Sequence, residues 1–346
     1  MNTKRYRVAQ WATGNVGSRA LRAVIEHPQL DLVGVYVYSE AKAGRDAGEL
    51  AGVSPTGVIA TNDIDEILAA KPDCVLYMPS WVNLDDVCRL LESGVNIAST
   101  RMEFHRPESM DPEERGRVEE ACKRGETSLY STGSSPGFVT EALPMVLLSL
   151  QRRLDRLVID EFADMSSRDS PEMIFQLMGF GTPAEQYDPI RAEYAGYSFA
   201  PSLQVVADAV GLPIDSVETA GEVAVARHRV EVAAGVLEPG TVGAMRTSVN
   251  CNHEGKPVLT FRANWYLTTD LEPQWDLRES GWRVMVEGDA PLDISIRFPV
   301  SKEEYPKVTP GLTAHRPVNA IPNVVEAEPG IRTTVDLPQI IPQLGG

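Results

Sequence analysis

The sequence lacks the patterns that mark several classes of protein. Its four cysteines include no C-x-x-C pair and suggest no disulfide framework, which is typical of a reducing cytoplasm. Its five histidines form no H-x-x-x-H or H-x-H pair, so we expect no metal site. No apolar run is long enough to span a membrane, and the first residues lead into a strand-like segment without a signal peptide. We therefore expect a cytoplasmic protein.

Basic charge is also scarce. The 346 residues carry a formal net charge of -17, and the acidic residues are spread along the whole chain. Such a surface repels phosphate backbones and anionic headgroups, which argues against nucleic-acid and membrane partners. The chain is longer than one hydrophobic core usually is, so we expect more than one domain.

One stretch near the start gives the strongest positive signal. The short apolar run at residues 8–11 breaks into a tight turn, and apolar residues then follow at helical spacing. The turn reads A-x-G-x-x-G, with Ala12 in place of the first glycine of a dinucleotide-binding fingerprint. A helix N-terminus after a parallel strand binds phosphate through its free N–H groups and its dipole. The predicted phosphate-binding residues are Ala12, Thr13, Gly14, Asn15, Val16 and Gly17.

The end of the second predicted strand, residues 32–38, bears on the choice of cofactor. An acidic residue at this tip would hold the ribose 2′-OH of NAD. Here Ser39 can donate to a phosphate, and Lys42 and Arg45 supply positive charge within reach, which favours the 2′-phosphate of NADP. Glu40, an acidic residue at the same tip, instead favours the ribose 2′-OH of NAD. We therefore predict NADP(H) as the preferred cofactor and leave the use of NAD(H) open.

The order of the predicted elements indicates an α/β protein. Strand and helix alternate through residues 1–140, as in a doubly wound parallel sheet of the Rossmann type. Consecutive strands then predict an α+β substrate or dimerisation domain over residues 141–310, with a mainly antiparallel sheet. Residues 311–346 are expected to return to the Rossmann domain as a helix interrupted by Pro317 and Pro322, followed from Leu337 by an exposed coil.

Loops at the carboxyl ends of parallel strands line the ligand crevice of this fold. Met78, Pro79 and Ser80 follow the fourth predicted strand, and Thr100 follows the fifth. We expect all four residues to border the cofactor.

Glu103 is the one carboxylate at the tip after the fifth predicted strand. Reducing an iminium requires a group that first deprotonates ammonia or an amine and then tolerates a cationic intermediate. A carboxylate partly buried beside Met102 and Phe104 could do both, so Glu103 is the candidate catalytic residue. His105 is the alternative acid or base at this tip.

Three absent motifs argue against related classes of enzyme. The last strand tip has no cysteine, which disfavours an acyl-thioester aldehyde dehydrogenase. No Glu-Lys-Pro follows the fifth predicted strand, which disfavours sugar oxidoreductases of this architecture. The sequence also lacks the His-His-x-x-Lys substrate motif of true dihydrodipicolinate reductases.

Five segments together resemble a known family. They are A-T-G-N-V-G at residues 12–17, the loop that carries Glu103, G-S-S-P-G-F at 133–138, M-G-F-G at 178–181 and T-A-H-R-P-V-N-A-I-P at 313–322. They are similar to the dihydrodipicolinate-reductase-like group that includes 2,4-diaminopentanoate dehydrogenase and the native amine dehydrogenases. The resemblance implies homodimers that use NAD(P)H for reversible reductive amination of a ketone or aldehyde with ammonia, with Glu103 as the catalytic group. Ser135 stands where the family often has Asn, which bears on nicotinamide or substrate contacts.

Further residues are candidates for the substrate pocket. Arg168 would suit a carboxylate-bearing substrate and is followed by Asp169, although a structural ion pair is an equal alternative. Phe138 would pack on substrate or nicotinamide, or else in the core. Thr313 and Asn319 would reach the site if the returning helix packs as expected. Two rival functions stay open, namely an imine or carbonyl reductase that needs no ammonia and a non-enzymatic NADPH-sensing protein.

Overall fold

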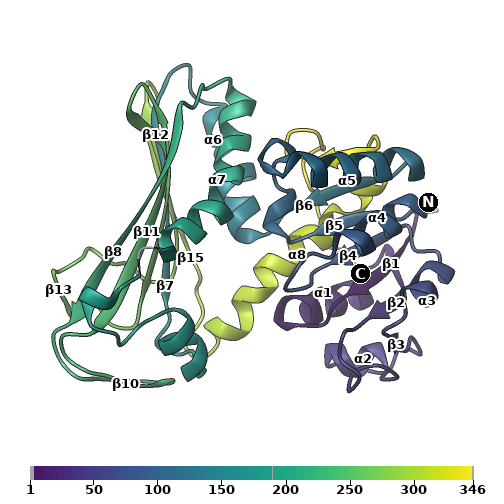
Figure 1. Ribbon diagram of the computed structural model, residues 1–346, viewed down its shortest axis with the longest axis horizontal. Helices are drawn as coiled ribbons and strands as arrows, with labels where there is room; N and C mark the ends of the chain where they lie inside the picture. The colour runs from purple at the N-terminus through teal and green to yellow at the C-terminus, as the bar shows by residue number, and fades with distance from the viewer. Residues whose placement is uncertain (1–3, 189, 345–346) are drawn as a thin grey trace. The chain divides into compact units, whose positions relative to one another are not determined.

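The computed structural model describes residues 4–188 and 190–344, and the chain forms two compact units (Figure 1). The first unit consists of Met1–Phe138 and Thr309–Gly346, and the second consists of Val139–Val308. The chain therefore leaves the first unit once and returns to it near its end.

The first unit is built on a seven-stranded sheet in the order β16-β6-β5-β4-β1-β2-β3, in which every pair is parallel. The order reverses at β1, as in a doubly wound Rossmann fold, which confirms the predicted fold class. Its strands are β1 (Tyr6–Trp11), β2 (Leu30–Tyr36), β3 (Ala60–Thr61), β4 (Cys74–Tyr77), β5 (Asn96–Ser99), β6 (Ser128–Ser131) and β16 (Gly330–Arg332). Its helices are α1 (Asn15–Glu26), α2 (Ala47–Ala51), α3 (Ile64–Ala69), α4 (Leu84–Glu92), α5 (Pro112–Gly125) and most of α8 (Tyr305–Val325).

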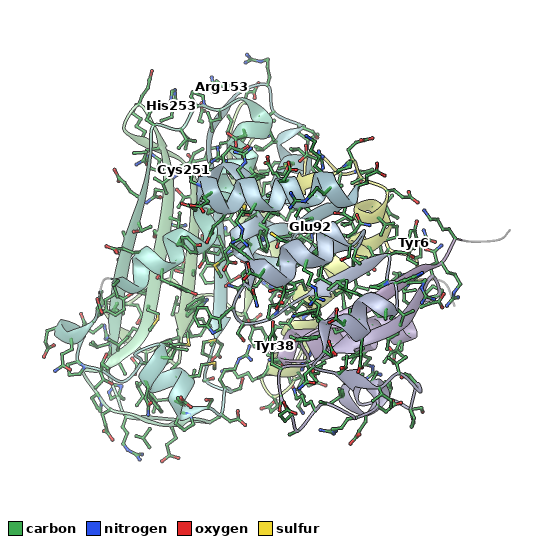
Figure 2. All side chains as sticks on the ribbon, turned by 45° about the vertical axis from the view of Figure 1, so that its right-hand side comes forward. Tyr6, Tyr38, Glu92, Arg153, Cys251 and His253 are labelled. Carbon is green, nitrogen blue, oxygen red and sulfur yellow. The ribbon has the colours of Figure 1, made fainter. Side chains whose placement is uncertain are left out.

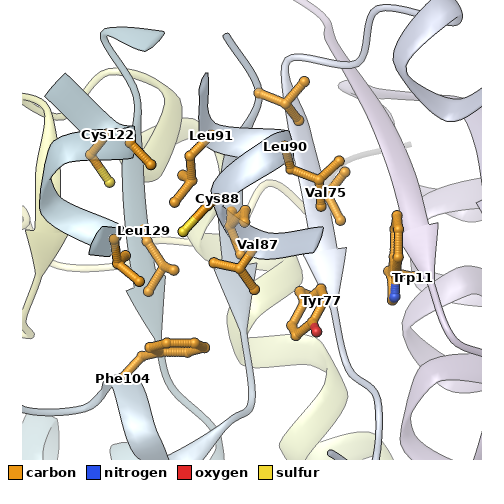
Figure 3. Close-up of a cluster of buried hydrophobic side chains, with 14 of the residues drawn as sticks. Trp11, Val75, Tyr77, Val87, Cys88, Leu90, Leu91, Phe104, Cys122 and Leu129 are labelled. Atoms are coloured by element: carbon orange, nitrogen blue, oxygen red, sulfur yellow. The ribbon is translucent and has the colours of Figure 1, made fainter. Parts of the chain in front are cut away.

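Helices cover both faces of this sheet. On one face, Leu90 of α4 and Cys122 of α5 pack against Tyr77 and Leu129 of the strands (Figure 3). The opposite face carries the alternate strand residues, because successive side chains of a strand point to opposite sides. There a second cluster joins α1 and α8 to the strands through Val8, Val24, Leu76, Val318 and Ile321.

The second unit is built on a mixed sheet in the order β13-β8-β11-β12-β7-β14-β15. Only the pair β7–β12 is parallel, so the sheet is mainly antiparallel, as predicted. Its strands are β7 (Leu154–Asp164), β8 (Ser216–Ala226), β11 (Val242–His253), β12 (Lys256–Tyr266), β13 (Leu271–Glu272), β14 (Gly281–Gly288) and β15 (Leu292–Arg297), beside a hairpin of β9 (Val230–Val232) and β10 (Gly235–Leu237). Helix α6 (Leu143–Leu148) precedes the sheet, and α7 (Ile190–Val210) packs on one face of it, where Phe199 stacks on Phe261 of β12 at 4.1 Å between ring centres.

Helix α8 differs from its expected form. It is continuous from Tyr305 to Val325, although Pro310, Pro317 and Pro322 lie inside it. Each internal proline removes one helical N–H bond and strains the preceding turn. Burial of the apolar face of α8 against the sheet offsets this cost, and sequence pattern alone does not show that burial.

The segment after α8 joins the first sheet before the predicted coil begins. β16 adds a strand to the edge of the sheet, where Ile331 pairs with Leu129 of β6. Leu337, at the start of the predicted coil, is 9% exposed and belongs to the apolar cluster around α8, so the prediction is wrong at this residue. Residues 338–344 form neither helix nor strand, and all but Ile340 are exposed.

Candidate active site

The glycine turn joins β1 to α1 near the centre of the parallel sheet. Gly14 is the N-cap of α1, and a Cβ added to it would meet no atom within 4 Å. A Cβ at Gly17 would lie 2.2 Å from the carbonyl oxygen of Ala12, so glycine is required where α1 packs on the turn. Ala12 has a φ of 70°, in the left-handed region that glycine adopts at lower cost. The result is an open helix N-terminus of the kind that holds a phosphate.

Gln10 braces this turn from within β1. Its side chain is fully buried, and Nε2 donates to the carbonyl oxygen of Ala12 at 2.9 Å. Its Oε1 is buried without a hydrogen-bond partner among the residues that the structure describes. Gln10 is not among the residues predicted from the sequence. A polar side chain inside the apolar run at residues 8–11 is the signal that could have found it.

The loop after β2 reaches back to the glycine turn through Lys42. Its Nζ donates to the backbone oxygen of Thr13 at 2.9 Å and lies 3.3 Å from the hydroxyl oxygen of the same residue. Arg45 is instead exposed and forms an ion pair with Glu49 at 2.7 Å. Of the two predicted basic residues, Lys42 therefore brings its charge to the turn. Ser39 is exposed at the start of the same loop.

Aromatic side chains pack together at the carboxyl ends of β1 and β2. The indole ring of Trp11 stacks on Tyr36 with 3.7 Å between ring centres, and its N–H donates to the hydroxyl of Tyr38 at 2.9 Å. Tyr38 follows β2 and is 53% exposed (Figure 2). Glu40 accepts a hydrogen bond from the amide of Asn62 at 2.8 Å, so its carboxylate already has a partner in the loop.

Glu103 lies in the short 3-10 turn Met102–Phe104, directly after β5. Arg101 binds its carboxylate with two nitrogens, Nη2 to Oε1 at 2.6 Å and Nε to Oε2 at 3.2 Å. The two side chains are 13% and 25% exposed, so the pair is partly shielded from water. Nη1 of Arg101 also donates to the backbone oxygen of Ser80 at 2.8 Å, which ties the tip of β5 to the tip of β4.

Glu103 also has a charged partner that the sequence did not predict. Glu103 is partly buried and Phe104 is buried, and the carboxylate pairs with the guanidinium of Arg101. The two-nitrogen contact from Arg101 fixes the orientation of the carboxylate. Of the other residues at these tips, Met78, Pro79 and His105 are buried, Thr100 is partly buried and Ser80 is exposed.

The segment after β6 is held by α8 through two side-chain contacts. The hydroxyl groups of Ser134 and Thr313 lie 2.8 Å apart, and Arg316 donates from Nε to the hydroxyl of Thr132 at 2.9 Å. The guanidinium of Arg316 also lies 5.7 Å from the ring centre of Phe138. The structure therefore brings two predicted residues, Phe138 and Thr313, to the tip of β6.

Two further features belong to this part of the chain. Ser135 has a buried hydroxyl without a hydrogen-bond partner among the described residues. Asn319 follows Arg316 by about one helical turn on α8 and is partly buried. Arg316 was not predicted from the sequence. Its position within the T-A-H-R-P-V-N-A-I-P segment, which carries part of the family resemblance, is the signal that could have found it.

Arg168 and Asp169 lie in the second unit, in the segment after β7. Arg168 is partly buried, and its guanidinium lies 5.9 Å from the ring centre of Tyr305. Asp169 is exposed. The structure describes this pair within the second unit and the other predicted site residues within the first.

The described parts of the chain, residues 4–188 and 190–344, were also compared with the requirements of metal and membrane binding. Within them, no three His, Cys, Asp or Glu side chains gather closely enough to hold a metal ion. No helix in these ranges has both the length and the apolar character of a membrane span.

Comparison with known proteins gives two family matches. The model of the 2,4-diaminopentanoate dehydrogenase C-terminal domain matches residues 138–344, and that of the dihydrodipicolinate reductase N-terminus matches residues 11–80. The second match covers the glycine turn and the tips of β2 and β4. The first covers the whole second unit and α8.

Whole-chain relatives agree with these matches. The chain is 32% identical to an amine dehydrogenase of Streptomyces virginiae over 95% of both sequences. It is 22% identical to the 2,4-diaminopentanoate dehydrogenase of Acetoanaerobium sticklandii, over 94% of this chain and 91% of that protein. Among solved structures, an amine dehydrogenase from Mycobacterium smegmatis has the same fold, with a TM-score of 0.76 and 22% identity over 98% of this chain and 97% of that one. The chain therefore belongs to the family of 2,4-diaminopentanoate dehydrogenases and amine dehydrogenases, as its sequence motifs predicted.

Proposed function

We propose that the chain is an NAD(P)H-dependent amine dehydrogenase that interconverts a ketone or aldehyde plus ammonia with the corresponding amine. Family membership makes it an oxidoreductase that acts on CH–NH2 groups. The observation that carries the finer proposal is the Glu103 carboxylate, which Arg101 holds at the tip of β5. β5 belongs to the same sheet as β1, which leads into the glycine turn, so one unit carries both the proposed phosphate site and the carboxylate.

Several features of the first unit fit a dinucleotide cofactor. The open side of Gly14 leaves room for a pyrophosphate at the N-terminus of α1, and the ammonium of Lys42 lies beside the turn. The buried hydroxyl of Ser135 lacks a partner that a ligand could supply. When bound, the nicotinamide supplies the hydride that reduces the substrate. The residues proposed to hold the cofactor are Ala12, Thr13, Gly14, Asn15, Val16, Gly17, Ser39, Lys42, Arg45, Met78, Pro79, Ser80, Thr100 and Ser135.

Glu103 is proposed as the catalytic acid and base. Its carboxylate takes a proton from ammonium, and the ammonia released attacks the carbonyl carbon. A C–N bond forms as the C=O π bond opens onto oxygen, and a proton moves from nitrogen to that oxygen to give the carbinolamine. Glu103 then returns the proton taken from ammonium to the hydroxyl of the carbinolamine, which leaves as water and gives a cationic iminium. The carboxylate, once more ionised beside Arg101, stabilises this cation. Arg101 acts as a positioning residue in this scheme.

The substrate contacts remain proposals of the same kind. Phe138 and Thr313 at the tip of β6, with Asn319 on α8, are the proposed substrate residues of the first unit. Arg168 and Asp169 are the proposed substrate residues of the second unit. An arginine there would suit a substrate with a carboxylate.

We also propose that the protein is a cytoplasmic homodimer. The face of the second sheet opposite α7 carries ordered pairs of opposite charge, such as Arg262 with Asp160 and Arg283 with Asp293. A face that carries both signs of charge can pair with a second copy of itself. The four cysteines are all buried and free, which suits a reducing compartment.

Replacing Lys42 by alanine is expected to change cofactor preference. If Lys42 meets the 2′-phosphate, its loss removes a charge-assisted hydrogen bond, and the KM for NADPH rises about tenfold while the KM for NADH changes less than about twofold. Steady-state kinetics with both cofactors measures this. Arg22→Ala is the control and should change neither KM, because Arg22 is an exposed residue about two turns after the start of α1 and pairs with Glu26. Equal increases for NADPH and NADH after Lys42→Ala would place Lys42 at the pyrophosphate instead.

The proposed function is tested by the dependence of turnover on ammonium. A panel of ketones, aldehydes and oxo acids is incubated with NADPH, and loss of its absorbance is followed with and without ammonium. Oxidation of NADPH that saturates with ammonium, together with appearance of the amine, is the expected result. Equal turnover without ammonium would identify an imine or carbonyl reductase. Tight NADPH binding with no turnover on any compound would favour the sensing function.

A further inference from the structure

Ala12 has a backbone conformation that alanine does not favour. It stands at the first position of the A-x-G-x-x-G turn, and its φ of 70° lies in the left-handed region. Glycine adopts this region freely, whereas the Cβ of any other L-residue then crowds the following carbonyl oxygen. Contacts around Ala12 must therefore hold it in this conformation.

One hydrogen bond on each side holds Ala12. Its N–H donates to the backbone oxygen of Tyr36, at the end of β2, over 2.9 Å. Its carbonyl oxygen accepts from Nε2 of Gln10 at 2.9 Å, and within residues 4–188 and 190–344 no other group donates to this oxygen. The second bond comes from a side chain, so a substitution can remove it and leave the first in place.

The amide of Gln10 has one orientation that fits its surroundings. Gln10 is fully buried, and its Nε2 also lies 3.3 Å from the backbone oxygen of Trp11 and 3.4 Å from that of Leu76. Three acceptors require the donor end of the amide here, because an amide oxygen would meet only other oxygens. The opposite atom, Oε1, has no hydrogen-bond partner among the described residues. A buried acceptor in this state opposes folding, so stability alone does not account for a glutamine in β1.

The bond from Gln10 also sets the direction of the peptide between Ala12 and Thr13. A trans peptide points its C=O and its N–H to opposite sides. Because the Ala12 oxygen points to Gln10, the Thr13 N–H points away from Gln10. Rotation of this peptide would exchange the two groups and put a carbonyl oxygen where the N–H now stands. Backbone N–H groups bind an anion and carbonyl oxygens repel it, so the direction of this peptide matters for a phosphate.

Helix α1 closes the other side of the same oxygen. A Cβ at Gly17 would lie 2.2 Å from the Ala12 oxygen and 3.2 Å from Nε2 of Gln10, so these groups are packed together beneath the helix. Ala12 itself is buried. Loss of the Gln10 amide would therefore leave the Ala12 oxygen without a donor and the left-handed conformation without its support on this side.

We propose that Gln10 is a positioning residue for the phosphates of the dinucleotide. Its hydrogen bond to the Ala12 carbonyl holds the turn in the binding conformation, a task that glycine at this position would accomplish through its own backbone freedom. Gln10 touches neither the cofactor nor the substrate in this role. The role rests on the proposed phosphate site at the N-terminus of α1.

The test is a double-mutant cycle between positions 10 and 12 in the full-length protein. Gln10→Met replaces the amide with an apolar group of similar length, and Ala12→Gly removes the cost of the left-handed φ. The Kd of NADPH is measured by fluorescence titration, and that of ADP by calorimetry. Gln10→Met is expected to raise both Kd values about tenfold, because only a fraction of the molecules keeps the binding conformation. In the Ala12→Gly background the same substitution should raise them about threefold or less.

Leu76→Met is the matched control. Leu76 is buried in the same apolar cluster of the first sheet and lies opposite Gln10 in the pairing of β1 with β4. This substitution alters the packing but removes no donor, so both Kd values should stay within about twofold in either background. Thermal unfolding of each unliganded variant is recorded beside the titrations, because a merely structural role would lower the Tm and leave the Kd values unchanged.

Several results would overturn the role of Gln10. Equal increases in Kd with and without Ala12→Gly would show that Gln10 does not act through the conformation of Ala12, and unchanged Kd values with a lower Tm would make it a structural residue. Gln10→Leu removes the same donor if Gln10→Met does not fold, and failure of both to fold even with Ala12→Gly would also contradict the proposal. If the unmodified protein binds neither NADPH nor ADP, the proposed cofactor site is itself wrong, whereas the other results contradict only the role of Gln10.

Discussion

Replacing Glu103 by glutamine is expected to lower the kcat of reductive amination by about 10³-fold while leaving the Kd of NADPH within about twofold of its original value. Glutamine has nearly the same shape and keeps one oxygen for Arg101, so the turn after β5 should persist. It cannot accept a proton from ammonium, and it offers no negative charge to the iminium. Single-turnover measurements of NADPH oxidation, beside fluorescence titration of NADPH, separate the chemical step from cofactor binding.

Glu108→Gln is the matched control for this experiment. Glu108 lies five residues after Glu103, in the segment between β5 and α5. It is exposed, and its carboxylate lies 3.6 Å from the guanidinium of Arg115. It should retain full activity, because its charge is not directed at the tips of the strands. An active Glu103→Gln enzyme would exclude the proposed mechanism, and a Glu103→Gln enzyme that fails to bind NADPH would show that the residue serves the cofactor rather than the chemistry.

The pairing of Glu103 with Arg101 shows where prediction from sequence ends. The sequence places Glu103 at a strand tip, because the alternation of strands and helices is a local pattern that fixes the order of the tips. Whether Arg101 turns toward Glu103 depends on the backbone of a three-residue 3-10 turn and on the backbone carbonyl of Ser80, which lies in the loop after β4. No spacing rule contains that information, so the pairing of Glu103 with Arg101 was not predicted.

The same limit applies to Lys42 and to α8. Lys42 and Arg45 look alike in the sequence, and only the fold brings Lys42 across 29 positions to Thr13 while Arg45 turns to Glu49. In α8, Pro317 and Pro322 predict interruption, but burial against the sheet keeps the helix continuous. In each case a contact between distant segments outweighs a local preference.

The glycine turn, in contrast, could be predicted from the sequence, because its conformation depends on residues within the turn itself. Replacing Gly17 by alanine tests this dependence. The added Cβ would lie 2.2 Å from the carbonyl oxygen of Ala12, which is backbone and cannot rotate away. The helix must then move off the turn, at a cost of about 2–3 kcal/mol, which corresponds to a fall in Tm of roughly 5–10 °C. Thermal unfolding followed by circular dichroism measures this loss, and NADPH binding should fall with it because α1 no longer holds its N–H groups in place.

Gly14→Ala separates the two uses of glycine in the same turn. A Cβ at Gly14 meets no atom within 4 Å, and its φ of -72° suits any residue, so the Tm should fall by less than about 3 °C. The same Cβ would occupy the space proposed for the pyrophosphate, so the Kd of NADPH should rise at least about tenfold. Stability lost at Gly17 and affinity lost at Gly14 would together locate the phosphates at the N-terminus of α1. If Gly14→Ala bound NADPH with unchanged affinity, the proposed phosphate site at the N-terminus of α1 would be excluded.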